Sequence, residues 1–245
     1  MKRIFSPVFF IAIFLFFSCG ISYRPQTMQY NNYRINTSQK QDSALTFLLR
    51  DYSDSINKSM NDVLGYNEAL MERKQRGNSL GFFITDAYLY MARKKFNTTV
   101  DAAFMNYGGI RLPELPAGNI TRGKIYELMP FDNLLLLLVV KGSVLKQYLD
   151  TLAAGDGVIV SGITMQIKSK TAFNIMVGGK ALDENAEYVI ANSDYSINNS
   201  SVLKAIPQKN IGYLQRDALL DYVILMKQQG KNISVSDVNR ISYVE

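Results

Sequence analysis

Residues 106–111 read Asn-Tyr-Gly-Gly-Ile-Arg, and the apolar segment Val100 to Met105 leads directly into them. The leading segment has the composition of a buried strand, and two glycines after it permit positive φ, as in a sharp turn. Backbone N–H groups in such a turn can face an anion, and the guanidinium of Arg111 can grip it with two donors. An aromatic residue, Phe131, returns some twenty residues later. The pattern indicates a site for a flat, anionic ligand, although a structural turn with Arg111 in a surface salt bridge stays open.

The composition excludes several classes of enzyme. The chain has no histidine and one cysteine, so zinc sites, histidine-based two-metal phosphoesterase sites and Ser-His-Asp or Cys-His arrangements are not expected. The acidic residues Asp183, Glu184 and Glu187 lie beside a predicted turn and read as a solvated face. No glycine-rich loop ends in Gly-Lys-Ser or Gly-Lys-Thr, so there is no P-loop. We expect no catalytic residue, no metal site and no cofactor bound by this chain.

The first residues are typical of export. Lys2 and Arg3 precede an almost wholly apolar run, and Ser18-Cys19-Gly20 supplies small residues at a plausible cleavage point. We interpret residues 1–18 as a lipoprotein-type signal peptide and Cys19 as the lipidation site, which predicts an exported lipoprotein of the bacterial cell envelope. A signal anchor is the alternative, although the run is shorter than the about 20 residues that a bilayer span needs.

Charge and composition describe the rest of the chain. The formal net charge is +6, and it falls to +4 when Lys2 and Arg3 are removed. A mildly basic balance suits a phosphate-bearing ligand or an acidic partner. The sequence has no basic run with interleaved aromatic residues, so nothing in it indicates nucleic-acid binding. Residues 19–40 are rich in Gln, Asn, Tyr, Ser and Thr and read as a tether between lipid and domain. Residues 41–245 are long enough for one domain with a sizeable core.

Periodicity predicts an α+β fold of layered helices and mixed sheet. Apolar residues at three- and four-residue steps predict a helix over 42–63, and further helices are expected over 79–93, 121–128, 143–152 and 215–229. Asn78 or Ser79, and Thr121, are candidate N-caps. Strands are expected at 100–105, 134–140, 158–160, 163–168, 172–177, 188–191 and within 233–244. Gly178-Gly179 reads as a tight hairpin turn and not as a phosphate loop.

Several motifs, taken in order, resemble one family. These are Asn-x-Gly-Gly-Ile-Arg at 106–111, Gly-x-Ile-Thr at 118–121, Pro-Phe-x-Asn at 130–133, and Lys-Gly at 141–142. Together they resemble the C-terminal domain of the 5′-nucleotidases, which include UDP-sugar hydrolase/5′-nucleotidases and animal ecto-5′-nucleotidase. Residues 77–87 resemble the family's helix start and 189–195 its late strand, so the resemblance spans about residues 42–245. In that family a separate N-terminal domain carries two metals and cleaves the phosphoester.

The resemblance implies roles for particular residues. Asn106 would meet the base, Gly108 and Gly109 would form the turn, and Arg111 would hold the phosphate. Phe131 and Tyr195 would sandwich the base, although both could be ordinary core or rim aromatics. Stacking between two aromatic rings contributes roughly 1–3 kcal/mol per base.

Two departures from the family pattern stand out. The family's further phosphate-binding arginine falls on Lys74, with Arg73 and Arg76 close by, and lysine is a point charge without arginine's fork. The family's Gly-Gly-Asp-Gly loop is replaced around Asn198 to Val202, where Ser201 takes the position of the aspartate that accepts from the ribose. A serine makes a neutral hydrogen bond, so ribose recognition is weakened.

The motifs resemble the family's C-terminal domain, and none resembles its metal-bearing N-terminal domain. Two hypotheses follow. In the first, this chain is the nucleotide-binding half of a 5′-nucleotidase or UDP-sugar hydrolase type of system, active with a metallophosphoesterase subunit in trans that carries the divalent metals. In the second, it is a non-catalytic nucleotide- or nucleoside-binding scaffold lipoprotein. A purely structural envelope lipoprotein is the remaining alternative.

Overall fold

The computed structural model describes residues 27, 29–30, 42–155, 157–235 and 239–244. The chain divides into two units, and the boundary between them lies between Leu48 and Leu49. The predicted signal peptide, Cys19 and nearly all of the predicted tether lie outside the described residues. Among the helices that the structure describes, none has the length and apolarity of a membrane span.

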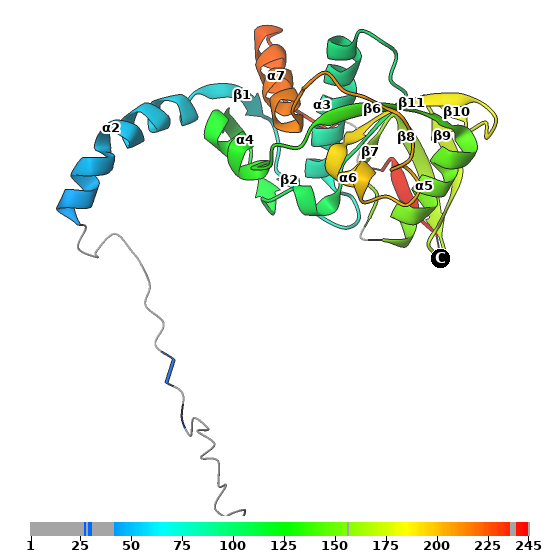
Figure 1. The fold of residues 1–245 in the computed structure, drawn as a ribbon, viewed down its shortest axis with the longest axis horizontal. Coiled ribbons are helices and arrows are strands. Elements are labelled where there is room, and N and C mark those ends of the chain that lie inside the picture. Colours follow the sequence, from blue (N-terminus) through cyan, green and yellow to red (C-terminus); the bar gives the residue numbers. More distant parts are fainter. Residues whose placement is uncertain (1–26, 28, 31–41, 156, 236–238, 245) are drawn as a thin grey trace, which may run out of the picture. The chain divides into compact units, whose positions relative to one another are not determined.

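The described residues combine helices with mixed sheets, which confirms the α+β prediction (Figure 1). The helices are α2 (Ser43–Met60), α3 (Ser79–Phe96), η2 (Tyr107–Gly109), α4 (Arg122–Leu128), α5 (Gly142–Ala154), α6 (Asp194–Asn198) and α7 (Gln215–Gln228). The strands are β1 (Val63–Asn67), β2 (Met71–Glu72), β3 (Ala102–Phe104), β4 (Glu114–Leu115), β5 (Gly118–Thr121), β6 (Leu135–Lys141), β7 (Val160–Ser161), β8 (Ile163–Lys168), β9 (Thr171–Val177), β10 (Lys180–Ala181), β11 (Glu187–Ser193), β12 (Gln208–Lys209) and β13 (Ile241–Tyr243).

A five-stranded sheet in the order β12-β6-β11-β3-β7 carries the core. Strand β11 runs parallel to β3 and antiparallel to β6. The aliphatic run predicted as a strand buried on both faces is β6, in which Leu135 to Leu138 are buried and Val139 is exposed. Helix α3 packs on β3 and β7, and α7 packs on α3. This sheet therefore places its central strands under a helical cover.

A four-stranded sheet in the order β10-β9-β8-β13 forms the second layer. Gly178 and Gly179 join β9 to β10 with φ of 56° and 80°, which confirms the predicted hairpin turn. Helix α5 contacts β9 of this sheet as well as β6 and β11 of the other, so it links the two layers (Figure 1).

Local signals place the helix ends. The side chain of Asn78 accepts a hydrogen bond from the N–H of Gly81 at 2.8 Å, and Thr121 accepts from Lys124 at 3.2 Å. Both predicted N-caps are confirmed, since each satisfies an N–H that the helix leaves without an internal partner.

The first predicted helix needs two corrections. Helix α2 ends at Met60, and residue 63, which was expected in the helix, begins β1. None of its residues is buried, although Leu49, Tyr52 and Ile56 share one face. The apolar spacing predicted the helix correctly, but spacing alone does not state whether another element covers the face.

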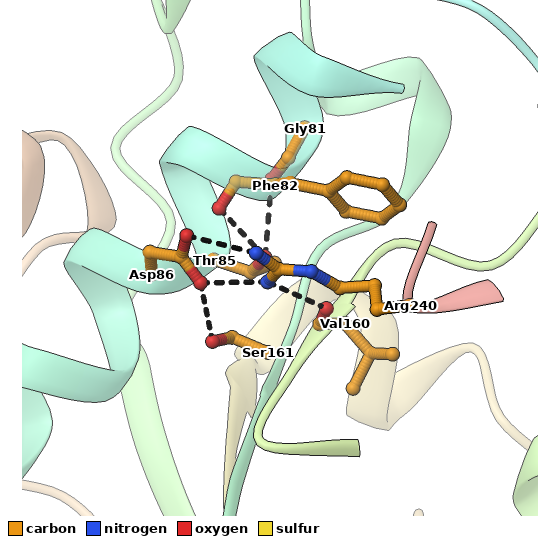
Figure 2. Close-up of polar contacts among 7 residues, drawn as sticks. All are labelled: Gly81, Phe82, Thr85, Asp86, Val160, Ser161 and Arg240. Atoms are coloured by element: carbon orange, nitrogen blue, oxygen red, sulfur yellow. Dashed lines mark hydrogen bonds and ion pairs between the residues drawn. The ribbon is translucent and has the colours of Figure 1, made fainter. Parts of the chain in front are cut away.

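A partly buried ion pair ties the C-terminal segment to α3. The guanidinium of Arg240, 8% exposed, binds both carboxylate oxygens of Asp86 at 2.7 and 3.1 Å (Figure 2). The hydroxyl of Ser161 donates to the same carboxylate at 2.5 Å, and the Arg240 guanidinium stacks 4.6 Å from the ring centroid of Phe82. This pair fixes the segment that leads into β13 against α3.

Candidate functional site

Sheet topology brings three separate segments to one edge. Because β3 and β11 are parallel, with Ala102 beside Ile190, their carboxyl ends lie at the same edge. Strand β6 runs the other way, and its first residue, Leu135, pairs with Ser193 at the end of β11. The segments after β3, after β11 and before β6 therefore meet, as is typical of ligand sites in open sheets with parallel strands.

These segments enclose a pocket of about 320 Å³. Its lining consists of Asn106, Gly108, Gly109, Arg111, Phe131, Asn133 and Tyr195. The structure thus gathers six of the residues that the sequence predicted for substrate binding. Asn133 was not among the predicted binding residues, although it ends the Pro-Phe-x-Asn motif that could have indicated it. Its backbone carbonyl accepts from the N–H of Gln215 at 2.8 Å, which fixes the segment.

The two aromatic residues of the pocket are exposed. Phe131 is 46% exposed and Tyr195 is 54% exposed, so neither is an ordinary core aromatic. Phe131 comes from the segment between α4 and β6, and Tyr195 comes from the first turn of α6. Exposed aromatic rings that line a concave surface are typical of sites that receive a flat apolar group.

Arg111 supplies the positive charge of the pocket. Its Nη1 donates to the carbonyl of Gly108 at 3.3 Å, and its guanidinium lies 5.7 Å from the ring centroid of Phe131. Among the described residues no carboxylate lies within ion-pair distance of Arg111, so the salt bridge considered as an alternative is not formed there. The guanidinium therefore keeps donors for an anionic ligand beside an aromatic face.

The glycine turn differs from its prediction. Residues 107–109 form a turn of 3₁₀ helix, and neither Gly108 nor Gly109 has positive φ. Backbone N–H groups of the turn could have faced an anion, but those of Gly109 and Ile110 donate to the carbonyls of Asn106 and Tyr107. Space explains Gly109, because a Cβ there would overlap Cε of Met105 and would stand 3.0 Å from Oδ1 of Asn106. The turn therefore shapes the pocket by its size, and the N–H groups of Gly109 and Ile110 are already bonded within it.

Three predicted binding residues do not line this pocket. Lys74 pairs with Glu72 at 2.5 Å on the surface. The guanidinium of Arg76 stacks 4.2 Å from the ring centroid of Tyr243, in a different pocket. Ser201 lies exposed in the turn that follows α6, outside the lining. The pocket thus holds neither the second cation nor the ribose partner where the sequence placed them.

Arg73 approaches the glycine turn instead of Lys74. Its Nη1 donates to the carbonyl of Ile110 at 2.5 Å, and its guanidinium lies 5.1 Å from the ring centroid of Tyr107. The pairing of β2 with β4 extends to Arg73, whose N–H donates to the carbonyl of Pro113. Because side chains alternate across a strand, this register turns Arg73 and Lys74 to opposite sides.

A buried tyrosine, Tyr88, contacts two of the segments that carry pocket residues. The hydroxyl of Tyr88 on α3 donates to Sδ of Met129 at 3.1 Å and lies 3.8 Å from Sδ of Met105. Burial raises the pKa of Tyr88 well above its usual value, so the phenol stays protonated. Met105 precedes Asn106, and Met129 lies two residues before Phe131, so one residue contacts both segments behind the pocket.

Sequence comparisons agree with the motif resemblance. The profile of the family described as "5′-nucleotidase, C-terminal domain" matches residues 56–208. A 5′-nucleotidase of Vibrio cholerae serotype O1 is 24% identical over 198 residues, which cover 75% of this chain and 34% of that protein. Protein UshA of Yersinia enterocolitica is 26% identical over 146 residues, covering 56% of this chain and 26% of that protein. The chain spans about a third of the length of the curated relatives that it matches.

Solved structures share the fold. The 5′-nucleotidase precursor of Thermus thermophilus superposes with a TM-score of 0.68 at 24% identity, over 82% of this chain and 43% of that one. The NAD nucleotidase of Haemophilus influenzae superposes with a TM-score of 0.62 at 17% identity, over 84% and 42%. In both cases less than half of the solved chain corresponds to this one.

Proposed function

This chain belongs to the family of 5′-nucleotidase C-terminal domains, and we propose that its pocket binds a nucleoside or a nucleoside monophosphate. One observation carries the proposal: two exposed aromatic rings and a guanidinium line the same pocket. The rings suit the base, and Arg111 suits the phosphate. The carboxamides of Asn106 and Asn133 can both donate and accept, as recognition of a base edge requires. Arg73, in place of Lys74, is the nearer candidate for a second phosphate contact.

The chain's own residues do not fit a two-metal hydrolytic centre. The sequence has no histidine, and the described part holds no group of three His, Cys, Asp or Glu side chains that could ligate a metal ion. We therefore propose that the phosphoester is cleaved by a metal-bearing phosphoesterase chain acting in trans.

We also propose that the protein is exported and anchored by a lipid in the cell envelope. Residues 1–18 would direct export, Cys19 would carry the lipid, and 19–40 would tether the domain. Radiolabelled palmitate should enter the wild-type chain in a bacterial host and should not enter Cys19→Ser. Equal incorporation into both chains would overturn the lipidation site.

Ligand binding is tested by thermal unfolding of the purified chain. AMP and adenosine should both raise Tm, because a ligand that binds only the folded state stabilises it. Arg111→Ala should remove most of the additional shift that AMP gives over adenosine, since it deletes the phosphate contact and leaves the rings. Arg50→Ala, which removes an exposed arginine of α2, is the control and should keep both shifts. An equal loss of the AMP and adenosine shifts in Arg111→Ala would contradict the phosphate role.

The trans hypothesis is tested by mixing this chain with a purified metallophosphoesterase that lacks a C-terminal domain of its own, AMP and a divalent cation. We expect phosphate release well above that of the metal-bearing chain alone. If AMP binds and the mixture releases no more phosphate than the partner alone, the non-catalytic binding lipoprotein is the better description.

A further inference from the structure

The two rings of the pocket come from segments far apart in the sequence. Phe131 lies between α4 and β6, and Tyr195 lies on α6. A flat group between them gains from both faces only when the spacing fits its thickness, because a gap of about 0.5–1 Å already loses a quarter to a half of the contact energy. Something must therefore hold the two segments at a set distance.

Asp194 makes the hydrogen bonds that join them. Its backbone N–H donates to the carbonyl of Leu134 at 3.1 Å, and its Oδ1 accepts from the N–H of Leu134, also at 3.1 Å. The same Oδ1 accepts from the N–H of Tyr195 at 2.7 Å. Leu134 stands three residues after Phe131, so one half-buried carboxylate is bonded to the segments of both rings.

Ordinary helix capping does not account for this carboxylate. The N-cap of α6 is Ser193, whose Oγ accepts from the N–H of Ser196 at 2.9 Å. The hydroxyl of Ser196 lies 3.4 Å from Oδ1 of Asn106, which connects α6 to the glycine turn as well. With the cap already supplied by Ser193, the Asp194 side chain serves the link to Leu134.

We propose that Asp194 is a positioning residue that sets the distance between the rings of Phe131 and Tyr195, and through it the affinity for the base. The inference rests on the proposed nucleotide-binding function. Asp194 acts through hydrogen-bond geometry and not through its negative charge, because both acceptor contacts are to backbone N–H groups. An amide oxygen in the same place can accept both bonds.

The experiment is calorimetric titration of the folded full chain with adenosine and with AMP, well below Tm. Asp194→Asn keeps the acceptor and loses the charge, so its Kd for adenosine should stay within about twofold of wild type. Asp194→Glu keeps the charge but moves the acceptor by one methylene, and Asp194→Ala removes it. Both variants should raise the Kd for adenosine about tenfold, which corresponds to about 1.4 kcal/mol of binding free energy. The affinity for AMP should fall by a similar factor, because these variants leave the phosphate contact of Arg111 unchanged.

Asp183→Ala is the matched control. Its carboxylate also accepts a backbone N–H, that of Asn185 at 2.9 Å, in an exposed turn away from the pocket. This variant should bind both ligands as the wild type does. Wild-type Kd values in Asp194→Glu, or a loss in Asp194→Asn as large as in Asp194→Glu, would overturn the positioning role. A wild-type chain that binds neither ligand would instead refute the proposed function itself.

Discussion

Gly108 and Gly109 are neighbours in the turn, yet their surroundings differ. A Cβ at Gly108 would meet its nearest neighbour, Nδ2 of Asn106, at 3.8 Å, which is ordinary contact, whereas a Cβ at Gly109 would crowd Met105 and Asn106. Since neither residue has positive φ, an alanine is compatible with the backbone at both positions. The pair therefore separates the effect of space from the effect of backbone freedom.

Gly109→Ala should lower the free energy of unfolding by about 1 kcal/mol, the low end for overpacking, because the atoms that a Cβ would meet are the ends of the Met105 and Asn106 side chains. Gly109→Ala should also lower the affinity for AMP, because the side chain of Asn106 must shift. Gly108→Ala should leave stability unchanged or raise it by up to about 1 kcal/mol. Urea unfolding followed by circular dichroism measures both. Equal stabilities of the two variants would contradict the spatial explanation of Gly109.

At this scale the structure gathers six of the predicted binding residues in one pocket and leaves three outside its lining. Asn106 and Tyr195 each lie two residues beyond a strand end, so the correct strands placed them at the correct edge. Lys74 pairs with Glu72 at the surface, whereas Arg73 contacts the glycine turn, because successive side chains of an extended segment point to opposite sides. The register of β2 on β4 depends on a partner more than forty residues away, which a local pattern does not reveal.

Among the elements, α7 holds the loop that carries Phe131. Arg216, in the first turn of α7 and 8% exposed, donates from Nη1 toward the carbonyls of Met129 and Phe131 at 3.4 and 3.5 Å. Its Nη2 pairs with the carboxylate of Asp132, and its guanidinium stacks 4.4 Å from the ring centroid of Tyr126. The guanidinium of Arg216 thus binds three successive parts of the loop, at Met129, Phe131 and Asp132.

Arg216→Lys should therefore loosen the loop although it keeps the charge, because an ammonium group cannot reproduce the fork or the stacking. We expect a loss of about 1–3 kcal/mol in the free energy of unfolding and weaker adenosine binding by calorimetry. Arg122→Lys is the control on α4, where the arginine makes a longer, partly exposed contact with Asp62 at 3.9 Å. Unchanged stability and affinity in Arg216→Lys would show that the loop is held by other contacts.

Element types with strong local signals were predicted correctly, and those set by distant partners were not. Helices α3, α5 and α7 and strands β8 and β9 follow from periodicity and turn residues within their own segments. Strand β1 was missed because its pairing partner, β5, lies more than fifty residues further on. Helix α6 was missed because five residues are too few for a periodic pattern.

On the scale of the whole molecule, Arg240 connects the end of the chain to its centre. Its pair with Asp86 joins the segment before β13 to α3 (Figure 2), and α3 also carries Tyr88, whose hydroxyl contacts Met129. No sequence motif indicated this pair, because Asp86 and Arg240 stand 154 positions apart. A buried charge pair of this kind contributes mainly through the penalty of leaving one partner alone.

Arg240→Met should lower the free energy of unfolding by about 3 kcal/mol, the lower end for broken buried pairs, since the Asp86 side chain stays 30% exposed. Asp86→Asn in the same chain should recover part of that loss, because no unpaired carboxylate remains. Lys124→Met, which removes an exposed pair with Glu127, should cost less than about 0.5 kcal/mol. A loss in Arg240→Met no larger than in Lys124→Met would contradict this role.

A crystal structure of the chain grown with AMP tests the nucleotide pocket most directly. We predict that the adenine ring lies between Phe131 and Tyr195, that its edge faces Asn106 and that the phosphate contacts Arg111. AMP bound elsewhere, or a pocket left empty at saturating AMP with the two rings packed against each other, would contradict the account.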